Sequence, residues 1–330
     1  MNLLWDRWTD FPDYIVGITR EIWEDRGIET LNRYYAPDIP VRTPMGVSVG
    51  NKATMAATMG TLAEFPDREL MAEDVIWCGD PAAGFLSSHR ILSTGTHTHD
   101  GVFGPATGRR FAIRVIADCA ARDGVIDDEW MVRDYGGIAR QLGQDPRDVA
   151  RALIAAEGGA SRAKRPFTPE ADIPGPYSGT GNANPWGTRY AETLTRIMAT
   201  DFTHVLRHYD RAAIAVWPGA QTLIGSRAIS EAWLRLRSAF PSARFAIHHT
   251  IGMEGGLMPP RAAIRWSLTG THDGWGAFGR PTGAPVHVMG ISHAEYGPYG
   301  PGGIGLRREF VLFDEVAIWK HILLHTGETE

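Results

Sequence analysis

Titratable side chains recur at matching positions in the two halves of this 330-residue chain. Glu129 corresponds to Glu309, and Asp118 corresponds to His293. Asp118 and His293 each interrupt an apolar run, where an ionisable group costs free energy unless it is paired or functional. Carboxylates and imidazoles in such surroundings can act as general acids or bases. The alternative for both residues is an outward-facing position at the edge of a sheet.

The two matched glutamates could face either way. Trp130 follows Glu129 and Phe310 follows Glu309. If both segments are strands, one member of each pair faces inward. An inward glutamate would be a buried acid able to move protons, whereas an outward one would be solvated. The pattern leaves both alternatives open.

Histidines supply further candidates for acid–base chemistry. His97 and His272 both follow Gly-Thr and precede a glycine-rich loop, and a histidine that braces this turn is slightly favoured over a catalytic one. His89 has no counterpart in the second half, although its neighbour Arg90 corresponds to Arg265. We therefore keep His89 and His97 as candidates for proton transfer.

The sequence predicts neither a metal site nor a bound cofactor. It has no HExxH motif, and the adjacent His248 and His249 would point to opposite faces of a strand. It also has no phosphate-binding loop, dinucleotide fingerprint or GxSxG elbow. The absence of these motifs favours chemistry carried out by protein side chains alone.

The elements that must position these residues come in two copies. Segments 95–108 and 270–283 are similar and lie 175 residues apart, and the same offset relates Gly50 to Gly225. A repeat of this kind indicates a duplicated domain. The two copies depart from this offset in their last hairpin, which is five residues longer in the second copy.

Apolar periodicity and turn signals predict the same order of elements in both copies, helices first and then a run of antiparallel strands. This order is typical of an α+β fold. Asn51 and Ser226 are predicted to cap helices, and Asp134 and Asp314 to cap a terminal segment. The predicted helices cover residues 12–36, 52–65, 146–156, 190–208 and 227–239, and the predicted strands cover 40–49, 69–78, 84–95, 110–121, 125–133, 243–253, 261–270, 286–296 and 306–312.

A segment rich in proline and glycine separates the two copies. Residues 157–188 contain five prolines among glycine, serine, threonine and asparagine, which favours an extended linker. We therefore predict a first domain at residues 1–156 and a second at residues 189–330. The linker is long enough to let the two domains pack through their sheets as an intramolecular pseudo-dimer, with further homo-oligomerisation left open.

The composition indicates a globular protein whose partner is a small molecule. A net charge of −5 gives no electrostatic reason to expect nucleic acid or an anionic membrane. No apolar run approaches the roughly 18 residues of a membrane span, and charged residues interrupt the N-terminus before a signal peptide could form. Cys78 and Cys119 lack CxxC spacing and are expected to be reduced. A cytoplasmic location is therefore predicted.

Several short motifs resemble those of a known family. They are Gly-Thr-His at 95–97, Pro-Ala-Thr-Gly at 105–108, Glu-Trp at 129–130 and Arg-Gln-Leu-Gly at 140–143, with Pro-Thr-Gly again at 281–283. These motifs resemble the SnoaL-like polyketide cyclase family, which belongs to the nuclear-transport-factor-two-like, cystatin-like superfamily. The resemblance spans about residues 15–143 and, more loosely, 190–322.

The resemblance implies two tandem cones, each a bent antiparallel sheet with helices packed in its concave face around an apolar pocket. It also implies cofactor-free intramolecular aldol chemistry, with an Asp on the final strand and a His on the preceding strand. The Asp position falls on Met131, or on Val311 in the second copy. The His position falls on Ala117 or, after a one-residue shift, on Asp118 and His293.

Two functions are compatible with these residues. The first is a cofactor-independent acid–base enzyme, such as a polyketide or ester cyclase, isomerase, dehydratase or hydrolase, acting on a small apolar carbonyl compound. The second is a non-catalytic binding or scaffold protein that keeps the pocket, as Met131 and Val311 would suggest. The catalytic candidates are Asp118, Glu129, His89, His97, His293 and Glu309. The residues expected to contact the substrate are Met131, Trp130, Phe103, Arg90, His272 and Val311.

Overall fold

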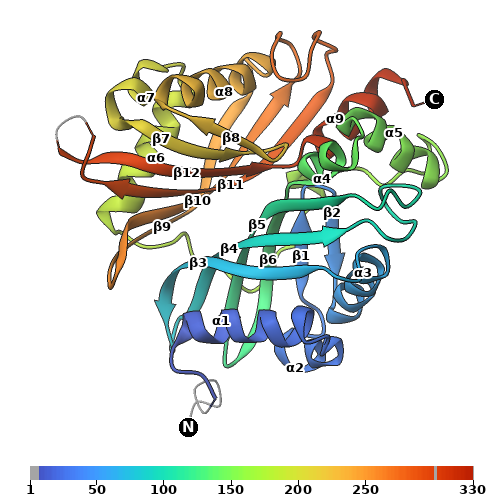
Figure 1. Ribbon diagram of the computed structural model, residues 1–330, viewed down its shortest axis with the longest axis horizontal. Helices are drawn as coiled ribbons and strands as arrows, with labels where there is room; N and C mark the ends of the chain where they lie inside the picture. Colours follow the sequence, from blue (N-terminus) through green and yellow to red (C-terminus); the bar gives the residue numbers. More distant parts are fainter. Residues whose placement is uncertain (1–6, 301–302, 330) are drawn as a thin grey trace.

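The computed structural model describes residues 7–300 and 303–329, and it contains two domains of the same architecture (Figure 1). Each domain has one six-stranded sheet, and the strand orders β2-β1-β6-β5-β4-β3 and β8-β7-β12-β11-β10-β9 are equivalent. The predicted duplication and the α+β class are therefore confirmed. None of the described helices is both long and apolar enough to cross a membrane.

The first sheet is mixed, which departs from the purely antiparallel sheet expected from the sequence. Its hairpin-connected strands pair antiparallel, but β1 lies parallel to β6, with Val41 opposite Glu129. The difference arises because β1 and β6 are far apart in sequence, so no hairpin dictates their direction. The strands are β1 (Pro40–Thr43), β2 (Gly46–Val49), β3 (Glu69–Asp80), β4 (Gly84–Thr96), β5 (Arg110–Arg122) and β6 (Val125–Arg133).

The predicted helix at residues 12–36 is broken into short pieces. A π-helical turn at Arg20–Glu24 ends before Arg26, whose φ of 63° no α-helix allows. The break lets the chain fold back over the concave face of the sheet. The pieces are α1 (Phe11–Thr19), a 3₁₀ turn (Ile28–Thr30) and α2 (Leu31–Tyr34), and the other helices of the domain are α3 (Asn51–Glu64), α4 (Tyr135–Leu142) and α5 (Pro146–Ala156).

The second domain repeats this plan, including elements that the sequence patterns did not reveal. The strands β7 and β8 and the helix α9 were not predicted. The longer last hairpin leaves strand pairing intact, with Gly297 opposite Gly305. The elements are α6 (Pro185–Met198), α7 (Thr203–His208), β7 (Tyr209–Trp217), β8 (Gln221–Ile224), α8 (Ser226–Ala239), β9 (Arg244–Gly255), β10 (Met258–Thr271), β11 (Pro285–Gly297), β12 (Gly305–Phe313) and α9 (Glu315–Thr326).

Two of the four predicted helix caps are wrong. Gly50 and Gly225 hold the cap positions of α3 and α8, and neither helix has a side-chain cap. Asn51 instead donates from Nδ2 to the carbonyl of Tyr35, at 3.2 Å. Ser226 is the first helical residue of α8. The sequence signal was displaced by one residue because both glycines adopt a positive φ before the helix.

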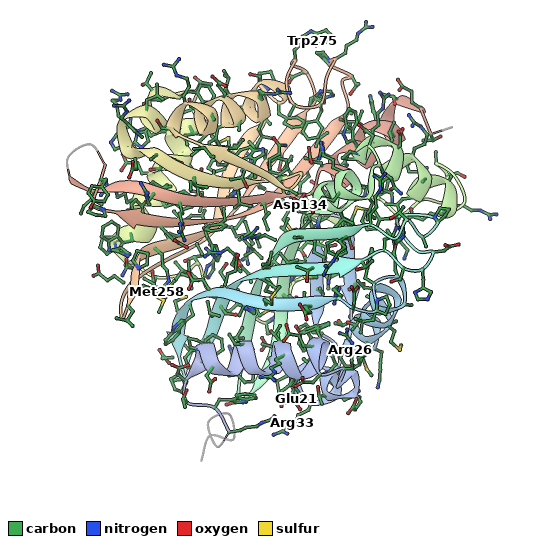
Figure 2. The ribbon with its side chains drawn as sticks, viewed as in Figure 1. Glu21, Arg26, Arg33, Asp134, Met258 and Trp275 are labelled. Atoms are coloured by element: carbon green, nitrogen blue, oxygen red, sulfur yellow. The ribbon has the colours of Figure 1, made fainter. Side chains whose placement is uncertain are left out.

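The caps predicted at Asp134 and Asp314 are confirmed, and Asp134 also joins the two domains. Its carboxylate accepts from the amide of Gly137 in α4 at 2.7 Å. It also accepts from the amides of Gly219 and Ala220, in the β7–β8 turn, at 2.8 and 2.7 Å. Asp134 therefore lies where the first domain meets the second (Figure 2).

The chain between the domains is ordered along their surfaces. Residues 157–184 contain no strand or α-helix, only a 3₁₀ turn at Pro169–Ala171. Asp172 forms an ion pair with the buried Arg42, and the hydroxyl of Tyr177 lies 2.7 Å from Nε2 of His249. Helix α6 begins at Pro185, inside the predicted linker, because Asn184 caps it.

The two sheets pack against each other through the faces that point away from α1 and α8 (Figure 1). An apolar cluster between them includes Ile116 and Val132 from the first sheet and Met289, Ile291 and Leu312 from the second. This arrangement is consistent with the expected intramolecular pseudo-dimer. It also assigns the opposite, concave face of each sheet to the domain interior.

Candidate functional site

The first domain encloses a cavity of about 440 Å³ between its helices and the concave face of its sheet. Helices α1 and α3 close one side, and β4, β5 and β6 form the other. A cavity of this size and character suits a small, largely apolar molecule. Its apolar walls include Ile15, Ile18, Leu70, Ile91, Phe103 and Ile113.

Strand alternation selects which predicted residues reach the cavity. On β6, Glu129, Met131 and Arg133 are two residues apart and all line it, which resolves the orientation of Glu129 in favour of the interior. His89 on β4 lines it too, as does Phe103 from the glycine-rich loop. Of the twelve candidates, the structure brings together Glu129, His89, Met131 and Phe103 at this cavity.

Glu129 is the carboxyl group of the cavity best placed for acid–base work. Its residue is 5% exposed, and burial raises its pKa from 4.5 to about 7. The charge of Arg133 and a hydrogen bond from the Tyr35 hydroxyl oppose that rise. A carboxyl group with a pKa near neutrality can both take and return a proton at physiological pH.

His89 is the second ionisable group at the cavity wall. Burial, and secondarily the charge of Arg90, lower its pKa to about 3, so the imidazole is neutral at physiological pH. Among the described residues, nothing hydrogen-bonds to its Nε2 atom. A neutral imidazole with a free ring nitrogen can hydrogen-bond to a ligand oxygen.

The histidines at 97 and 272 brace loops and do not line the cavity. Nδ1 of His97 lies 3.2 Å from Oγ1 of Thr107, and Nδ1 of His272 lies 3.0 Å from Oγ1 of Thr282. Glu64 holds the first of these loops, accepting from the amide of Phe103 at 2.9 Å. The equivalent contacts in both domains support the turn-bracing interpretation.

Asp118 and His293 lie between the domains, outside the cavity. Both are almost fully buried. Asp118 Oδ2 accepts from Arg265 Nη1 at 3.0 Å, and Nε2 of His293 lies 2.8 Å from the hydroxyl of Ser88. These partners in the opposite domain explain why an ionisable residue occurs within each apolar strand. The structure does not bring Asp118 or His293 to the cavity, and their expected role in proton transfer stays a prediction.

The interface is pseudo-symmetric, and it accounts for two more candidates. Arg265 lies over the ring of Trp130, at 3.7 Å from its centroid, and its counterpart Arg90 lies over Phe310, at 3.6 Å. Each arginine therefore meets the residue that corresponds to the other's partner, as in a twofold interface. Trp130 and Arg90 contact the opposite domain and do not line the cavity of the first domain, so their expected contact with substrate stays a prediction that this cavity does not support.

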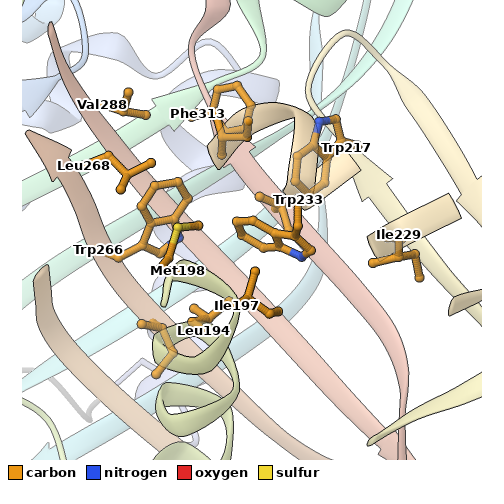
Figure 3. Packing of buried hydrophobic residues seen from close by; sticks show 14 of the residues in the cluster. Leu194, Ile197, Met198, Trp217, Ile229, Trp233, Trp266, Leu268, Val288 and Phe313 are labelled. Atoms are coloured by element: carbon orange, nitrogen blue, oxygen red, sulfur yellow. The ribbon is translucent and has the colours of Figure 1, made fainter. Parts of the chain in front are cut away.

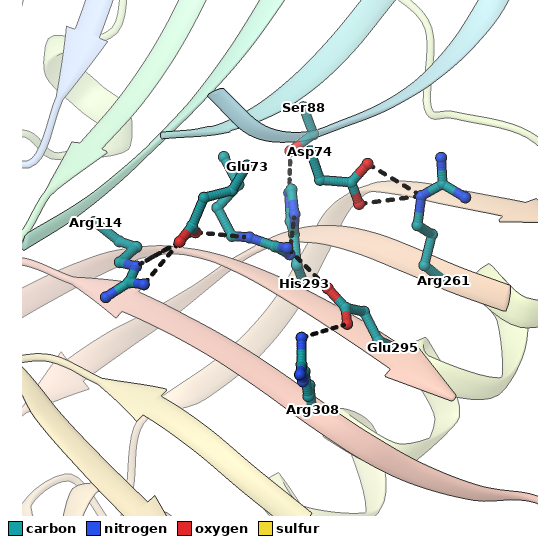
Figure 4. Close-up of polar contacts among 9 residues, drawn as sticks. Glu73, Asp74, Ser88, Arg114, Arg261, His293, Glu295 and Arg308 are labelled. Carbon is teal, nitrogen blue, oxygen red and sulfur yellow. Dashed lines mark hydrogen bonds and ion pairs between the residues drawn. The ribbon is translucent and has the colours of Figure 1, made fainter. Parts of the chain in front are cut away.

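Further ion pairs lie on and between the two sheets, among them the pairs of Asp74 with Arg261 and of Glu73 with Arg114 (Figure 4). Arg90 donates to Glu295 at 2.8 Å, and Arg261 lies 3.0 Å from Asp74. Arg90 also contacts Glu73, which holds Arg114 at 2.7 Å. These ion pairs hold the two sheets together and engage most of the charged groups named here.

Aromatic side chains occupy the interior of the second domain (Figure 3). Trp233 packs edge-on against Trp217, with 4.8 Å between ring centroids, and lies 6.1 Å from Trp266. Trp217 also packs edge-on against Phe313, at 5.8 Å. These rings fill the space that is open in the first domain. At the equivalent positions of the first domain stand Thr43 for Trp217, Thr58 for Trp233, Ile91 for Trp266 and Arg133 for Phe313.

Glu309 is held by hydrogen bonds inside this filled core. Its carboxylate accepts from the hydroxyls of Tyr190 and Tyr209 at 2.9 and 2.8 Å and from Nε1 of Trp233 at 3.3 Å. Burial raises its pKa to about 7, as it does for Glu129. Val311, like Glu309, belongs to a core packed with side chains. Glu309 and Val311 do not line the cavity of the first domain, and their expected roles in catalysis and substrate contact stay predictions that this packed core does not support.

The polar residues of the cavity that sequence reasoning missed include Arg68, Arg133 and Tyr35. The alternation Glu129-x-Met131-x-Arg133 could have placed Arg133 on the face of Glu129. Arg68 follows α3 in a turn, and Tyr35 ends α2, so neither has a periodicity that assigns it to a face. Their positions depend on how the helices fold over the sheet.

Two family models match the chain. One describes a SnoaL-like polyketide cyclase and matches residues 14–142, and the other describes a SnoaL-like domain and matches residues 188–296. No curated protein matches the sequence.

Solved structures of single domains are similar to part of the chain. IdmH from Streptomyces antibioticus, proposed to be a polyketide cyclase, is 27% identical over 40% of this chain and 97% of its own, with a TM-score of 0.36. AclR from Streptomyces galilaeus, proposed to be a hydroxylase, is 18% identical over 39% and 92%, with a TM-score of 0.35. A proposed polyketide cyclase from Acidithiobacillus ferrooxidans is 21% identical over 39% and 92%, also with a TM-score of 0.35.

Proposed function

Because the chain belongs to the SnoaL-like family and carries two tandem domains of it, we propose that the first domain is a cofactor-independent acid–base enzyme. Its substrate is a small apolar carbonyl compound bound in the cavity, and Glu129 is its proton-transfer group. The second domain serves as the structural partner whose sheet supports the first.

The observation that supports this proposal most strongly is the contrast between the two matched glutamates. Glu309 receives hydrogen bonds from two tyrosines and a tryptophan. In the first domain Ile15 stands at the position of Tyr190 and Thr58 at that of Trp233, so Glu129 lacks both of these donors. Its carboxyl group lines an open apolar cavity, where a substrate C–H or O–H group can reach it.

The reaction that these groups would support begins at a carbon next to a carbonyl. Glu129, as carboxylate, takes the proton from that carbon, and the electrons of the C–H bond move to the carbonyl oxygen to form an enolate. The neutral His89 imidazole donates a hydrogen bond to the enolate oxygen from Nε2. In ring closure, the enolate carbon then attacks a second carbonyl of the same molecule, and the alkoxide that forms takes the proton from Glu129. In isomerisation, a conjugated enolate takes the proton back from Glu129 at another carbon.

The runner-up is a binding protein without catalysis. Met131 stands where the resemblance would place a catalytic Asp, and the cavity would still hold an apolar ligand. Binding without turnover is the result expected for this alternative.

Hydrogen–deuterium exchange at an acidic carbon tests the proposal before the natural substrate is known. The protein is incubated in D₂O with 2-tetralone, a compact apolar ketone, and deuterium uptake next to the carbonyl is followed by NMR. We expect Glu129→Gln to reduce the catalysed exchange by about 10²- to 10⁴-fold, the usual contribution of a general base.

Glu309→Gln is the matched control, since it makes the same change at the equivalent position of the filled domain. It should leave the exchange rate close to that of the wild type. Equal exchange by the wild type and Glu129→Gln would overturn the catalytic proposal, and saturable binding without exchange would favour the runner-up.

A further inference from the structure

Arg68 is a buried cation that faces the cavity of the first domain. It ends the turn that follows α3, where its amide donates to the carbonyl of Phe65 at 3.0 Å. The residue is only 5% exposed, and its side chain lines the cavity wall. Burying a guanidinium group costs free energy that a hydrogen-bonded counter-charge normally offsets.

No such counter-charge is found for Arg68 within residues 7–300 and 303–329. None of the carboxylates there forms an ion pair with it, and its Nε atom has no hydrogen-bond partner. The charged or ionisable groups that influence it are Arg133, Tyr135 and Arg26, and two of these three are cations. The surroundings therefore increase the demand for an anion.

Arg133 brings a second guanidinium group to the same cavity. It ends β6, and its Nη1 atom lies 3.5 Å from the hydroxyl of Tyr135, a long contact to a neutral group. In the described part of the chain no carboxylate lies within ion-pair distance of it. The cavity thus holds two arginines that form no ion pair with a described carboxylate, although the charge of Arg133 acts on Glu129 from a distance.

The second domain shows what replaces these arginines when there is no cavity. Ala243 stands at the position of Arg68, and Phe313 stands at that of Arg133. Both belong to the filled apolar core. A fold of this kind therefore does not need cations at these two positions. The arginines are present in the domain that has a cavity and absent from the domain whose core is filled.

We propose that Arg68 and Arg133 form an anion subsite that binds a carboxylate of the substrate. The proposal rests on the proposed use of this cavity as a substrate site. Guanidinium groups match the planar, two-oxygen geometry of a carboxylate and hold it in a fixed orientation. The substrate class is then an apolar oxo-acid with its carboxylate at one end of the cavity.

The spacing of Glu129 and Arg133 on the sheet limits how long this molecule can be. Arg133 lies four residues beyond Glu129 on the same face of β6, which corresponds to about 13 Å along a strand. A carboxylate held by the arginines then lies within about that distance of the reacting carbonyl, because the charge of Arg133 still acts on Glu129, and this leaves room for an apolar body of about two rings. This spacing separates the binding charge from the group that transfers the proton.

A matched pair of ligands tests the subsite. We would measure the binding of 6-acetyl-2-naphthoate and of its methyl ester to the full-length protein by calorimetry at low ionic strength. The two compounds share their apolar body and ketone and differ in charge. We expect the wild type to bind the carboxylate at least about tenfold more tightly than the ester, the range of charge-assisted hydrogen bonds.

Arg68→Met and Arg133→Met should each remove most of this preference while changing ester affinity by less than about threefold, since the apolar walls are kept. Arg68→Lys should restore part of it because the charge is retained. Arg110→Met is the control, because it removes an exposed arginine of β5 that does not line the cavity. If one methionine variant fails to fold, as judged by circular dichroism, the other still decides the outcome.

A preference that survives in both methionine variants, or an equal affinity of the wild type for acid and ester, would overturn the subsite. These outcomes are distinct from failure of the proposed function. If Glu129→Gln loses the exchange but the two methionine variants keep the preference for the carboxylate over the ester, the catalytic proposal is retained and the subsite is rejected. An arginine-dependent preference without any catalysed exchange would retain the subsite and reject the catalysis.

Discussion

The two domains share one backbone plan and use its interior in opposite ways. The first leaves about 440 Å³ open behind its helices, whereas in the second three tryptophans and a phenylalanine fill the equivalent space. Of the two equivalent glutamates, Glu129 lines the cavity of the first domain, whereas Glu309 is hydrogen-bonded inside the core of the second. A cone-shaped sheet therefore permits an internal site but does not by itself create one.

The comparison also separates the residues of the cavity from the residues of the interface between the domains. Both concave faces hold the matched glutamates, and both outer faces hold the matched arginines Arg90 and Arg265. Their partners Asp118 and His293 have diverged, yet each still lies at the centre of the interface. An ionisable residue inside an apolar strand can thus serve packing between domains as well as chemistry.

Exchanging the key side chain between the domains is the strongest test of the comparison. Trp233→Thr should lower the free energy of unfolding by about 3–5 kcal/mol, because it opens a cavity in a packed core and removes one donor to Glu309. Chemical denaturation would measure this change. The reciprocal Thr58→Trp should abolish 2-tetralone exchange by filling the first cavity. Unchanged stability in the first variant, or unchanged exchange in the second, would break the comparison.

The pH dependence of stability in Glu309→Gln tests the assignment of Glu309 as a buried core acid. In the wild type, the Glu309 pKa is about 7 in the folded state against 4.5 unfolded, so the folded state holds the proton more tightly. Its contribution to stability is present below pH 4.5 and is lost as the pH rises through 7, by about 3 kcal/mol. The variant should therefore show a smaller fall in unfolding free energy between pH 4.5 and 8. An identical fall in both proteins would contradict the assignment.

Asp118→Asn is expected to have the smallest effect and to separate interface from cavity. Weakening the contact with the buried Arg265 should lower the free energy of unfolding by about 1–3 kcal/mol. Deuterium exchange should stay within about twofold of the wild type, since Asp118 does not line the cavity. A large loss of exchange in a stably folded Asp118→Asn protein would return this residue to the catalytic machinery.

Strand periodicity predicted much of the sheet and part of the candidate site. It put Glu129 and Met131 on one face of β6, because successive side chains alternate. It could not say which face is concave, so Asp118 and Trp130 were equally plausible in the cavity. Arg68 was not predicted to line the cavity because side chains in a turn do not alternate between two faces. The direction of its side chain depends on how the preceding helix is placed.

The amino-acid sequence by itself determined that the molecule is a duplicated α+β domain, because the repeat offset, turn residues and strand alternation are local properties of the chain. Only the tertiary structure decided that one copy is hollow and the other solid. Residues such as Thr58 and Trp233 reveal nothing alone, since free volume is the sum of side chains that helices and distant strands bring together. The same assembly decided which acids meet a cavity and which meet an arginine across the interface.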